Sequence, residues 1–281
     1  MSYFSELCEI AKDIPKQTLD LNTPRKRSRP PTQTFSDFAI HREQGDWAEY
    51  ILTVGLNDVL SSKYDVVKYG KSDKIIAGQV GFKKFYEKYQ DELETIGKRP
   101  DVLVFQKGVV NTTNISMMDT QKADIVSSAM LGIEIRSSSF LAKKYQLKNI
   151  DEPKKFMSFT PKSEDIQVVM KWVETYNVSH YYAQVFFDEI YMISFKKILE
   201  TIRDHIDDKT ICRVDKHLKN QLKTTIHINI SQGVKIGDIK TPPIPKSERT
   251  ELDSGRLLHY VSFNNGAVTI NENSILSILG T

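Results

Sequence analysis

The chain has 281 residues, of which 40% are hydrophobic and 27% charged, and a formal net charge of +3. This composition is typical of a globular protein, and the length suits one large domain or a core with an accessory domain. No hydrophobic run is long enough for a membrane span or a secretory signal, so we expect a cytoplasmic protein. Cys8 and Cys212 lack the spacing of a metal site and are expected to be free thiols.

A basic segment follows the amino-terminal region, for which we predict a helix. Residues 24–31 concentrate four positive charges between prolines, a pattern that disfavours a helix and indicates an extended arm or linker. These cations are Arg25, Lys26, Arg27 and Arg29. Such an arm can lie along DNA phosphates and add affinity without sequence preference, or it can be a solvated linker.

Residues 45–60 have the apolar periodicity of a helix. Glu49, Leu52, Leu56 and Val59 recur on one stripe, so that the Glu49 carboxylate extends an apolar face. Glu49 is either part of a site or a solvated glutamate near a helix end.

Two short strand-like segments further along the chain each contain an acidic residue. Asp101 follows Pro100 at the start of the apolar run 102–105, and Glu134 interrupts the run 131–138. Because strand side chains alternate between faces, Ile133 and Ile135 can enter a core while Glu134 and Arg136 emerge on the other side. If the two strands are neighbours, Asp101 and Glu134 lie close together.

This pattern resembles the signature of the PD-(D/E)XK nuclease superfamily, which includes many Type II restriction endonucleases. The stretches 134–141 and 158–165 are most similar to the AccI-like group of these enzymes. The resemblance covers roughly residues 40–200. It implies an α/β fold, namely a PD-(D/E)XK nuclease core with a mixed central sheet flanked by helices.

The resemblance also implies a chemistry and a set of site residues. Mg²⁺ would be held by Asp101, Glu134 and the carbonyl of Ile135, which are hard oxygen ligands. Glu49 resembles the helix glutamate that supplements the metal site in many of these nucleases. Arg136 would offset charge that develops on the phosphate during hydrolysis of the phosphodiester bond.

Two features depart from the family pattern. Arg136 stands where the superfamily usually has lysine, and arginine cannot act as a base. The missing lysine could be Lys98, Lys143 or Lys144, and the last two are also candidates for contacts with DNA phosphates. The spacer of 32 residues between the two carboxylates is long and indicates an excursion around 111–114 and 119–129.

The remaining segments continue the expected core and add a β-rich extension. We predict a helix that begins near 160–165, and strands at 181–188 and 190–195 with a turn at Asp188 and Glu189. Residues 224–230 alternate like a strand, 235–256 indicate a polar loop, and 257–263 with 267–270 suggest a hairpin. In that loop, Arg249 or Arg256 could read guanine, although an irregular surface segment is the simpler interpretation.

These predictions give three regions: an amino-terminal helix and basic arm at 1–34, a nuclease core at 35–205, and a carboxy-terminal extension at 206–281 for DNA recognition or dimerisation. One compact domain could contain all three. A Type II enzyme is expected to act on double-stranded DNA as a homodimer, in the cytoplasm of a prokaryote that also carries a cognate DNA methyltransferase. A structure-directed repair or recombination nuclease and a non-catalytic DNA-binding protein remain as alternatives.

Overall fold

The computed structural model describes the whole chain except residues 22–24, 26, 72–74, 119–122, 217–223 and 281. Its centre is a seven-stranded mixed sheet with the order β1-β2-β3-β5-β6-β9-β12. The strands are β1 (Tyr64–Lys68), β2 (Val102–Gln106), β3 (Leu131–Ser137), β5 (Ser179–Val185), β6 (Glu189–Ser194), β9 (Val234–Thr241) and β12 (Ala267–Ile270). Only β3 and β5 pair in parallel; the other neighbours are antiparallel.

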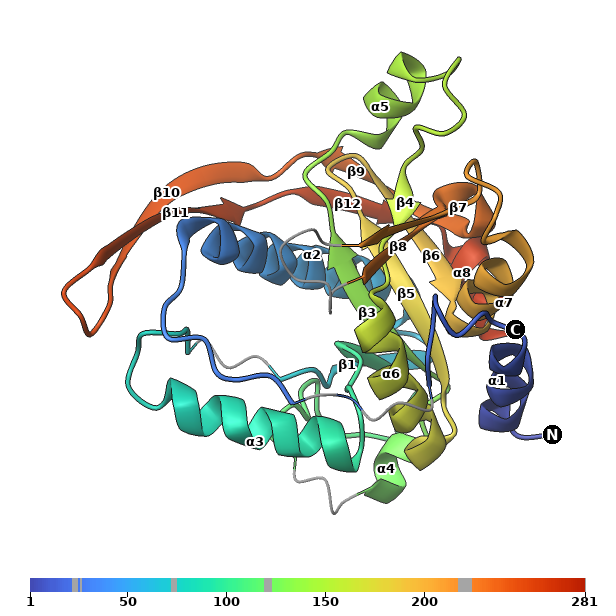
Figure 1. The fold of residues 1–281 in the computed structure, drawn as a ribbon, viewed down its shortest axis with the longest axis horizontal. Coiled ribbons are helices and arrows are strands. Elements are labelled where there is room, and N and C mark those ends of the chain that lie inside the picture. The colour runs from blue at the N-terminus through green and yellow to red at the C-terminus, as the bar shows by residue number, and fades with distance from the viewer. Residues whose placement is uncertain (22–24, 26, 72–74, 119–122, 217–223, 281) are drawn as a thin grey trace.

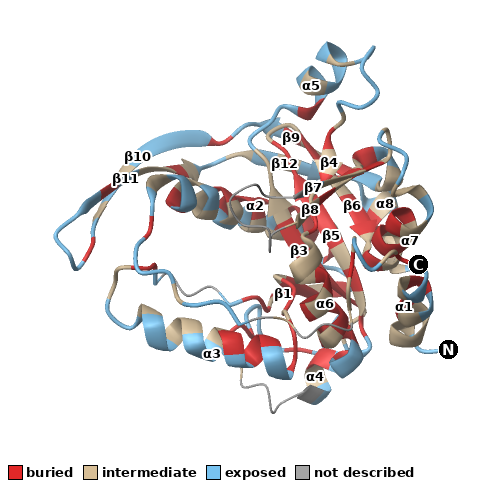
Figure 2. Ribbon diagram, viewed as in Figure 1, coloured by how far each residue is buried: buried red, intermediate tan, exposed pale blue. Residues whose placement is uncertain are grey.

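Helices cover both faces of this sheet (Figure 1), which confirms a mixed sheet flanked by helices. On one face α2 (Ser36–Leu60) and α8 (Glu272–Leu279) pack against a core that includes Leu52, Leu56 and Ile133. On the other face α1 (Tyr3–Lys12), α6 (Ser163–Tyr176) and α7 (Phe195–His205) enclose a second core. Figure 2 shows buried residues along the sheet and on the inner sides of these helices.

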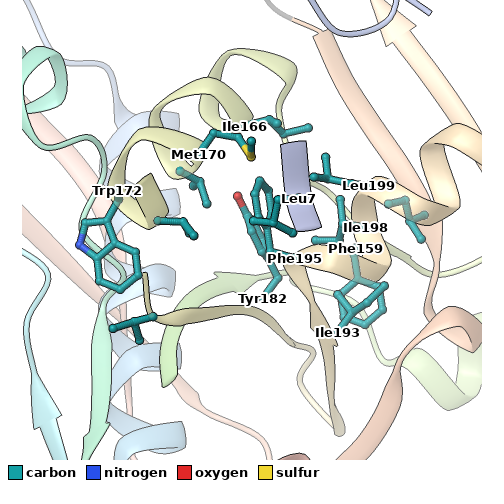
Figure 3. Close-up of a cluster of buried hydrophobic side chains, with 14 of the residues drawn as sticks. Leu7, Phe159, Ile166, Met170, Trp172, Tyr182, Ile193, Phe195, Ile198 and Leu199 are labelled. Carbon is teal, nitrogen blue, oxygen red and sulfur yellow. The ribbon is translucent and has the colours of Figure 1, made fainter. Parts of the chain in front are cut away.

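The second core is made of large apolar side chains from helices and strands that lie far apart in sequence. Figure 3 shows Leu7 and Phe195 beside Tyr182 of β5, with Trp172 on one side of this group and Leu199 on the other. These five side chains are at most 1% exposed. This burial fixes the position of α6 relative to β3 and β5, and α6 carries one of the site residues described below.

Helix α2 begins nine residues earlier than the predicted helix at 45–60. Gly45 lies within this helix, where nothing lies within 4 Å of the position that a Cβ would occupy. A glycine inside a helix costs only about 1 kcal/mol relative to alanine. The many contacts that α2 makes with the sheet outweigh that cost.

The remaining elements lie around the central sheet. A three-stranded sheet contains β4 (Ser158–Phe159), β8 (Thr224–Asn229) and β7 (Cys212–Lys216), and a short 3-10 turn (Ile230–Gln232) follows β8. A separate two-stranded ribbon, β10 (Ile244–Glu251) and β11 (Leu257–Asn264), projects over α2. The other helices are α3 (Phe82–Thr95), α4 (Ala123–Ser127) and α5 (Ala142–Lys148).

Three local predictions were wrong. The polar loop predicted at 235–256 instead holds most of β9 and all of β10, and the predicted hairpin partners do not pair with each other. β11 pairs with β10, whereas β12 returns to the central sheet beside β9. The turn expected at Asp188 and Glu189 lies slightly earlier, because β6 already begins at Glu189.

Segments from the predicted carboxy-terminal extension are part of the central sheet. β9 pairs with β6, β12 pairs with β9, and Ile236, Ile239 and Ile270 belong to the core beneath α2. No helix in the described ranges is long and apolar enough to cross a membrane.

Candidate active site

The candidate site lies where β2 and β3 separate. The two strands pair at three positions, from Val104 opposite Leu131 to Val102 opposite Ile133. Asp101 is the residue just before β2. Its side chain takes the place of a backbone acceptor for β3, because its Oδ2 atom accepts a hydrogen bond of 2.6 Å from the Ile135 N–H. Asp101 therefore sits inside the fork between the two strands.

Glu134 emerges from β3 beside this fork. The alternation of side chains sends Ile133 and Ile135 into the core beneath α2, as predicted, and turns Glu134 to the opposite face. The Glu134 side chain is only 4% exposed. Its Oε1 atom lies 2.5 Å from Lys98 Nζ and 3.1 Å from Arg136 Nη2, whereas its buried Oε2 atom has no hydrogen-bond partner in the described structure.

A second carboxylate shares the same two cations. Asp165 Oδ2, in the first turn of α6, lies 2.5 Å from Arg136 Nη2 and 3.4 Å from Lys98 Nζ. Lys98, Glu134, Arg136 and Asp165 are called the Glu134 cluster below. Two positive and two negative groups thus face each other in a largely buried space.

The backbone before Asp101 explains how Lys98 reaches this cluster. Gly97 has a φ of +84°, and a Cβ at this position would clash with the backbone of Val168 and Trp172. Glycine lets the turn press against α6, where the Lys98 N–H donates a 2.9 Å hydrogen bond to the Val168 carbonyl. Of the three lysines considered from the sequence, this turn brings Lys98 to the carboxylates.

Gly70, after β1, has a similar role on the other side of Asp101. Its N–H donates a 3.0 Å hydrogen bond to the Asp101 carbonyl. A Cβ at Gly70 would lie 2.9 Å from Asp101 Cα and 3.0 Å from Asp101 Oδ1. The absence of a side chain at residue 70 therefore lets the chain lie directly against the candidate ligand.

The charges in the site shift the pKa values of its carboxylates in opposite directions. Burial, together with the nearby Glu134 and Glu49, raises the pKa of Asp101 well above its ordinary value. Burial alone would also raise the pKa of Glu134, but Lys98 and Arg136 outweigh it and lower that pKa. Lys98 and Arg136 likewise outweigh burial at Asp165, whose pKa is lowered.

Glu49 approaches the fork from α2, across the sheet edge. Its Oε2 atom lies 3.3 Å from Lys68 Nζ of β1. Burial raises the pKa of Glu49, with Asp46 and Glu134 adding to the effect and Lys68 opposing it. A pocket of about 440 Å³ runs between Glu49 and Val102, the neighbour of Asp101, and opens this flank of the fork to solvent.

The donor atoms at the fork suit a hard divalent cation. The carbonyl and N–H of a strand residue point to the same side, so the Ile135 carbonyl faces the fork together with the Asp101 carboxylate. The unpartnered Glu134 Oε2 atom is the kind of buried acceptor that a cation would satisfy. Within the described ranges no three His, Cys, Asp or Glu side chains form a metal-binding group. A site here would combine two carboxylates with the carbonyl and water, as Mg²⁺ often does.

The predicted phosphate contacts lie in two separate places. In the basic arm, Arg27 Nη2 lies 2.8 Å from Asp91 Oδ1 of α3, Arg25 is half-buried, Arg29 is exposed, and Lys26 lies outside the described residues. The arm runs beside α3 (Figure 1), so part of its charge is neutralised within the protein.

The other two predicted phosphate contacts are on α5. Lys143 Nζ lies 3.0 Å from Asp238 Oδ1 of β9, and Lys144 is exposed. Both residues are on a helix that projects from the body of the molecule (Figure 1). Neither is part of the Glu134 cluster, so they remain candidates for DNA contact rather than for the missing lysine.

Sequence reasoning overlooked Asp165 as a site residue. The sequence predicts only that a helix begins near 160–165, and an acidic residue in the first turn of a helix is common because the helix dipole favours it. The signal that could have found it is weak: a helix following the Glu134 strand must pack on that strand's face. Lys68, the partner of Glu49, was also not singled out.

Comparison with known proteins identifies a family. The family model described as AccI restriction endonuclease matches residues 1–150 and 146–281 of the chain. No curated protein and no solved structure gives a significant match. The two matched segments together span the whole sequence.

Proposed function

The chain belongs to the AccI restriction endonuclease family, and on this premise we propose that it hydrolyses phosphodiester bonds of double-stranded DNA with Mg²⁺ held at the β2–β3 fork. Asp101, Glu134 and the Ile135 carbonyl are the proposed ligands. The fold supports a PD-(D/E)XK core made of α2, β1, β2, β3, α6 and β5, which occur in the chain order expected for that core.

The observation that carries this proposal is the state of the Glu134 carboxylate. One oxygen is held by two cations, while the other is buried without a hydrogen-bond partner in the described structure. A purely structural ion pair would be expected to satisfy both oxygens, because an unpaired buried acceptor costs about 1–3 kcal/mol. Asp101, whose pKa is raised by burial and by its neighbouring carboxylates, marks the same place as favourable for added positive charge.

The protein groups around the fork have complementary tasks. Mg²⁺, when bound, supplies polarisation of the phosphate and activation of a water molecule. Arg136 stays charged at all working pH values and can donate two parallel hydrogen bonds to a phosphate. Lys98 is a compact positive charge that can stabilise the developing charge on the phosphate, and it is the lysine best placed to replace the one missing from the motif.

Glu49 supplements this site in the proposed mechanism. Its position beside the pocket at the fork would let its carboxylate, which pairs with Lys68, help to hold water near a bound cation. The exposed cations Lys144 and Arg29 are proposed to contact phosphates, which would add affinity without choosing a sequence.

The proposed oligomeric state follows from the symmetry of a palindromic DNA recognition site. We propose a symmetric homodimer, because two active sites related by a twofold axis match the two strands of such a site. The enzyme would act in the cytoplasm of a prokaryote, with a cognate DNA methyltransferase that protects the same sequence in the host DNA.

Digestion of phage-sized duplex DNA by the purified protein tests the proposal. With Mg²⁺ we expect discrete bands, and with chelator intact DNA; the band ends then give the recognition site. A smear would contradict sequence-specific cleavage and favour a structure-directed or nonspecific nuclease. Intact DNA across salt concentrations and with Mg²⁺ or Mn²⁺ would contradict nuclease activity and favour a DNA-binding protein.

A further inference from the structure

We propose that Asp165 is a positioning residue of this site, which holds Lys98 and Arg136 so that Glu134 remains available to a divalent cation. This inference rests on the proposed function, because it assumes that Glu134 is a metal ligand. It assigns a task to a carboxylate that lies outside the metal-binding fork.

The charges around Glu134 provide the first step. Lys98 Nζ and Arg136 Nη2 both approach the same Glu134 oxygen, Oε1, at 2.5 and 3.1 Å. With Asp165 present, the two cations are balanced by two carboxylates. Without it, the two cations would face Glu134 alone within this cluster, and a divalent cation would have to approach a more positive site.

The distances provide the second step. Asp165 Oδ2 lies closer to Arg136 Nη2, at 2.5 Å, than Glu134 Oε1 does, at 3.1 Å. Lys98 has the opposite preference, since it lies 2.5 Å from Glu134 and 3.4 Å from Asp165. Asp165 therefore already holds most of the Arg136 interaction, and it offers a second acceptor within reach of Lys98 when a metal competes for Glu134.

The rigidity of Asp165 provides the third step. Its N–H donates a 3.0 Å hydrogen bond to the Lys162 carbonyl in the first turn of α6, where the helix dipole favours a negative charge. The same helix accepts the Lys98 N–H at Val168, and Trp172 of α6 is fully buried in the core. Helix α6 therefore fixes both the Asp165 carboxylate and the backbone of Lys98.

Binding of Mn²⁺, measured from the loss of the free-ion electron paramagnetic resonance signal, tests this proposal without relying on activity. Mn²⁺ prefers the same oxygen ligands as Mg²⁺. We expect Asp165→Asn to weaken Mn²⁺ binding about tenfold, as is common when a group that orients metal ligands is lost. The matched control is Glu164→Gln, which removes the same charge one residue away, and it should change the affinity less than twofold.

A double-mutant cycle separates positioning from a general field effect. If Asp165 acts by holding Lys98 and Arg136, then Asp165→Asn should weaken Mn²⁺ binding far less in an Arg136→Met background, where the cation nearest to Asp165 is gone. Equal weakening in both backgrounds would overturn the proposal, and so would unchanged affinity in Asp165→Asn itself. The double variant removes one charge of each sign, so it also serves if the single variant does not fold.

Two further comparisons distinguish a failure of this proposal from a failure of the proposed function. Asp165→Glu, which keeps the charge, should bind Mn²⁺ nearly as well as the wild type; a loss as large as that of Asp165→Asn would contradict a positioning role. If the wild-type protein itself binds no Mn²⁺ and cleaves no DNA, the proposed metal site fails. If the wild type binds Mn²⁺ and Asp165→Asn binds it equally well, only the role of Asp165 fails.

Discussion

Lys98 and Arg99 are neighbours in the chain, yet they belong to two buried charge clusters of different character. Lys98 joins the Glu134 cluster, whereas Arg99 joins Glu92 of α3 and Lys71, which together are called the Glu92 cluster. In the Glu92 cluster each carboxylate oxygen faces a different cation: Arg99 Nε lies 2.8 Å from Oε1, and Lys71 Nζ lies 2.5 Å from Oε2. In the Glu134 cluster one carboxylate oxygen is unpartnered in the described structure.

We interpret this difference as one between a structural ion pair and a site prepared for a ligand. Arg99 also donates hydrogen bonds to the carbonyls of Ser116 and Met118 and lies over the Tyr69 ring, so that the Glu92 cluster joins α3 to the edge of the sheet. The Glu134 cluster leaves one buried carboxylate oxygen without a hydrogen-bond partner in the described structure. The Glu92 cluster should therefore matter for stability, and the Glu134 cluster for metal binding and cleavage.

The largest expected effect is on cleavage by Glu134→Gln. Loss of the proposed metal ligand would remove several kcal/mol of transition-state stabilisation, so we expect the rate of single-turnover DNA cleavage to fall by about 10³-fold or more. Binding of duplex DNA, measured by a mobility shift in chelator, should change little. Wild-type cleavage by this variant would contradict the assignment of Glu134.

The corresponding variant in the Glu92 cluster is Glu92→Gln. It leaves Arg99 buried with a weakened partner, and breaking a buried pair in this way typically costs about 3–5 kcal/mol. We expect a loss of about 3 kcal/mol in the free energy of unfolding, measured by urea denaturation. Cleavage at temperatures where the variant is folded should stay near the wild-type rate; a loss as large as that of Glu134→Gln would remove the distinction between the clusters.

A smaller, pH-dependent effect is expected from His180, a buried residue beside the Glu134 cluster. Burial lowers the pKa of His180 to about 3, below the ordinary value of about 6.5. Between these values the unfolded chain binds a proton that the folded chain does not, so stability falls as the pH falls from 6.5 towards 3. Relative to His180→Phe, the wild type should lose about 2 kcal/mol of unfolding free energy between pH 7 and pH 5. Parallel pH profiles for the two proteins would contradict this.

The smallest expected effect is on affinity for DNA, for which the proposed phosphate contacts lie outside both clusters. Lys144 on α5 is exposed, and a phosphate contact there would contribute about 0.9 to the slope of log K against log salt. Lys144→Gln should reduce that slope by about this amount in a salt titration of binding. Lys12→Gln on α1, where Lys12 pairs with Glu9, is the matched control and should leave the slope unchanged. Equal slopes for wild type and Lys144→Gln would exclude Lys144 as a contact.

The sequence predicted the elements of the fold where periodicity is strong and failed where pairing partners are distant. The apolar stripe of α6 corresponds to its buried face, and the alternation in β3 places Ile133 and Ile135 in the core beneath α2. The pairings of β9 and β11 could not be predicted, because 235–256 is polar and the Asn265–Gly266 turn signal favours a local hairpin. In the structure Asn265 and Gly266 both have positive φ, but they link strands of different sheets.

The two central carboxylates of the candidate site could be predicted from the sequence, but the charged residues that pair with Glu134 and with each other could not. Asp101 and Glu134 follow from an acidic residue in each of two apolar runs. Asp165 depends on how α6 packs on β3, and the choice of Lys98 over other lysines depends on the positive φ of Gly97. Such contacts arise from tertiary packing, which leaves little trace in local sequence.

Cleavage by Glu134→Gln and Glu92→Gln, measured side by side in single-turnover reactions with Mg²⁺ on the same duplex DNA, tests the central claim most directly. Both variants lose one buried negative charge, so the comparison isolates the position of that charge. The account predicts undetectable or at least 10³-fold slower cleavage for Glu134→Gln and near wild-type cleavage for folded Glu92→Gln. Equal rates for the two variants would contradict the claim that the β2–β3 fork is the catalytic metal site.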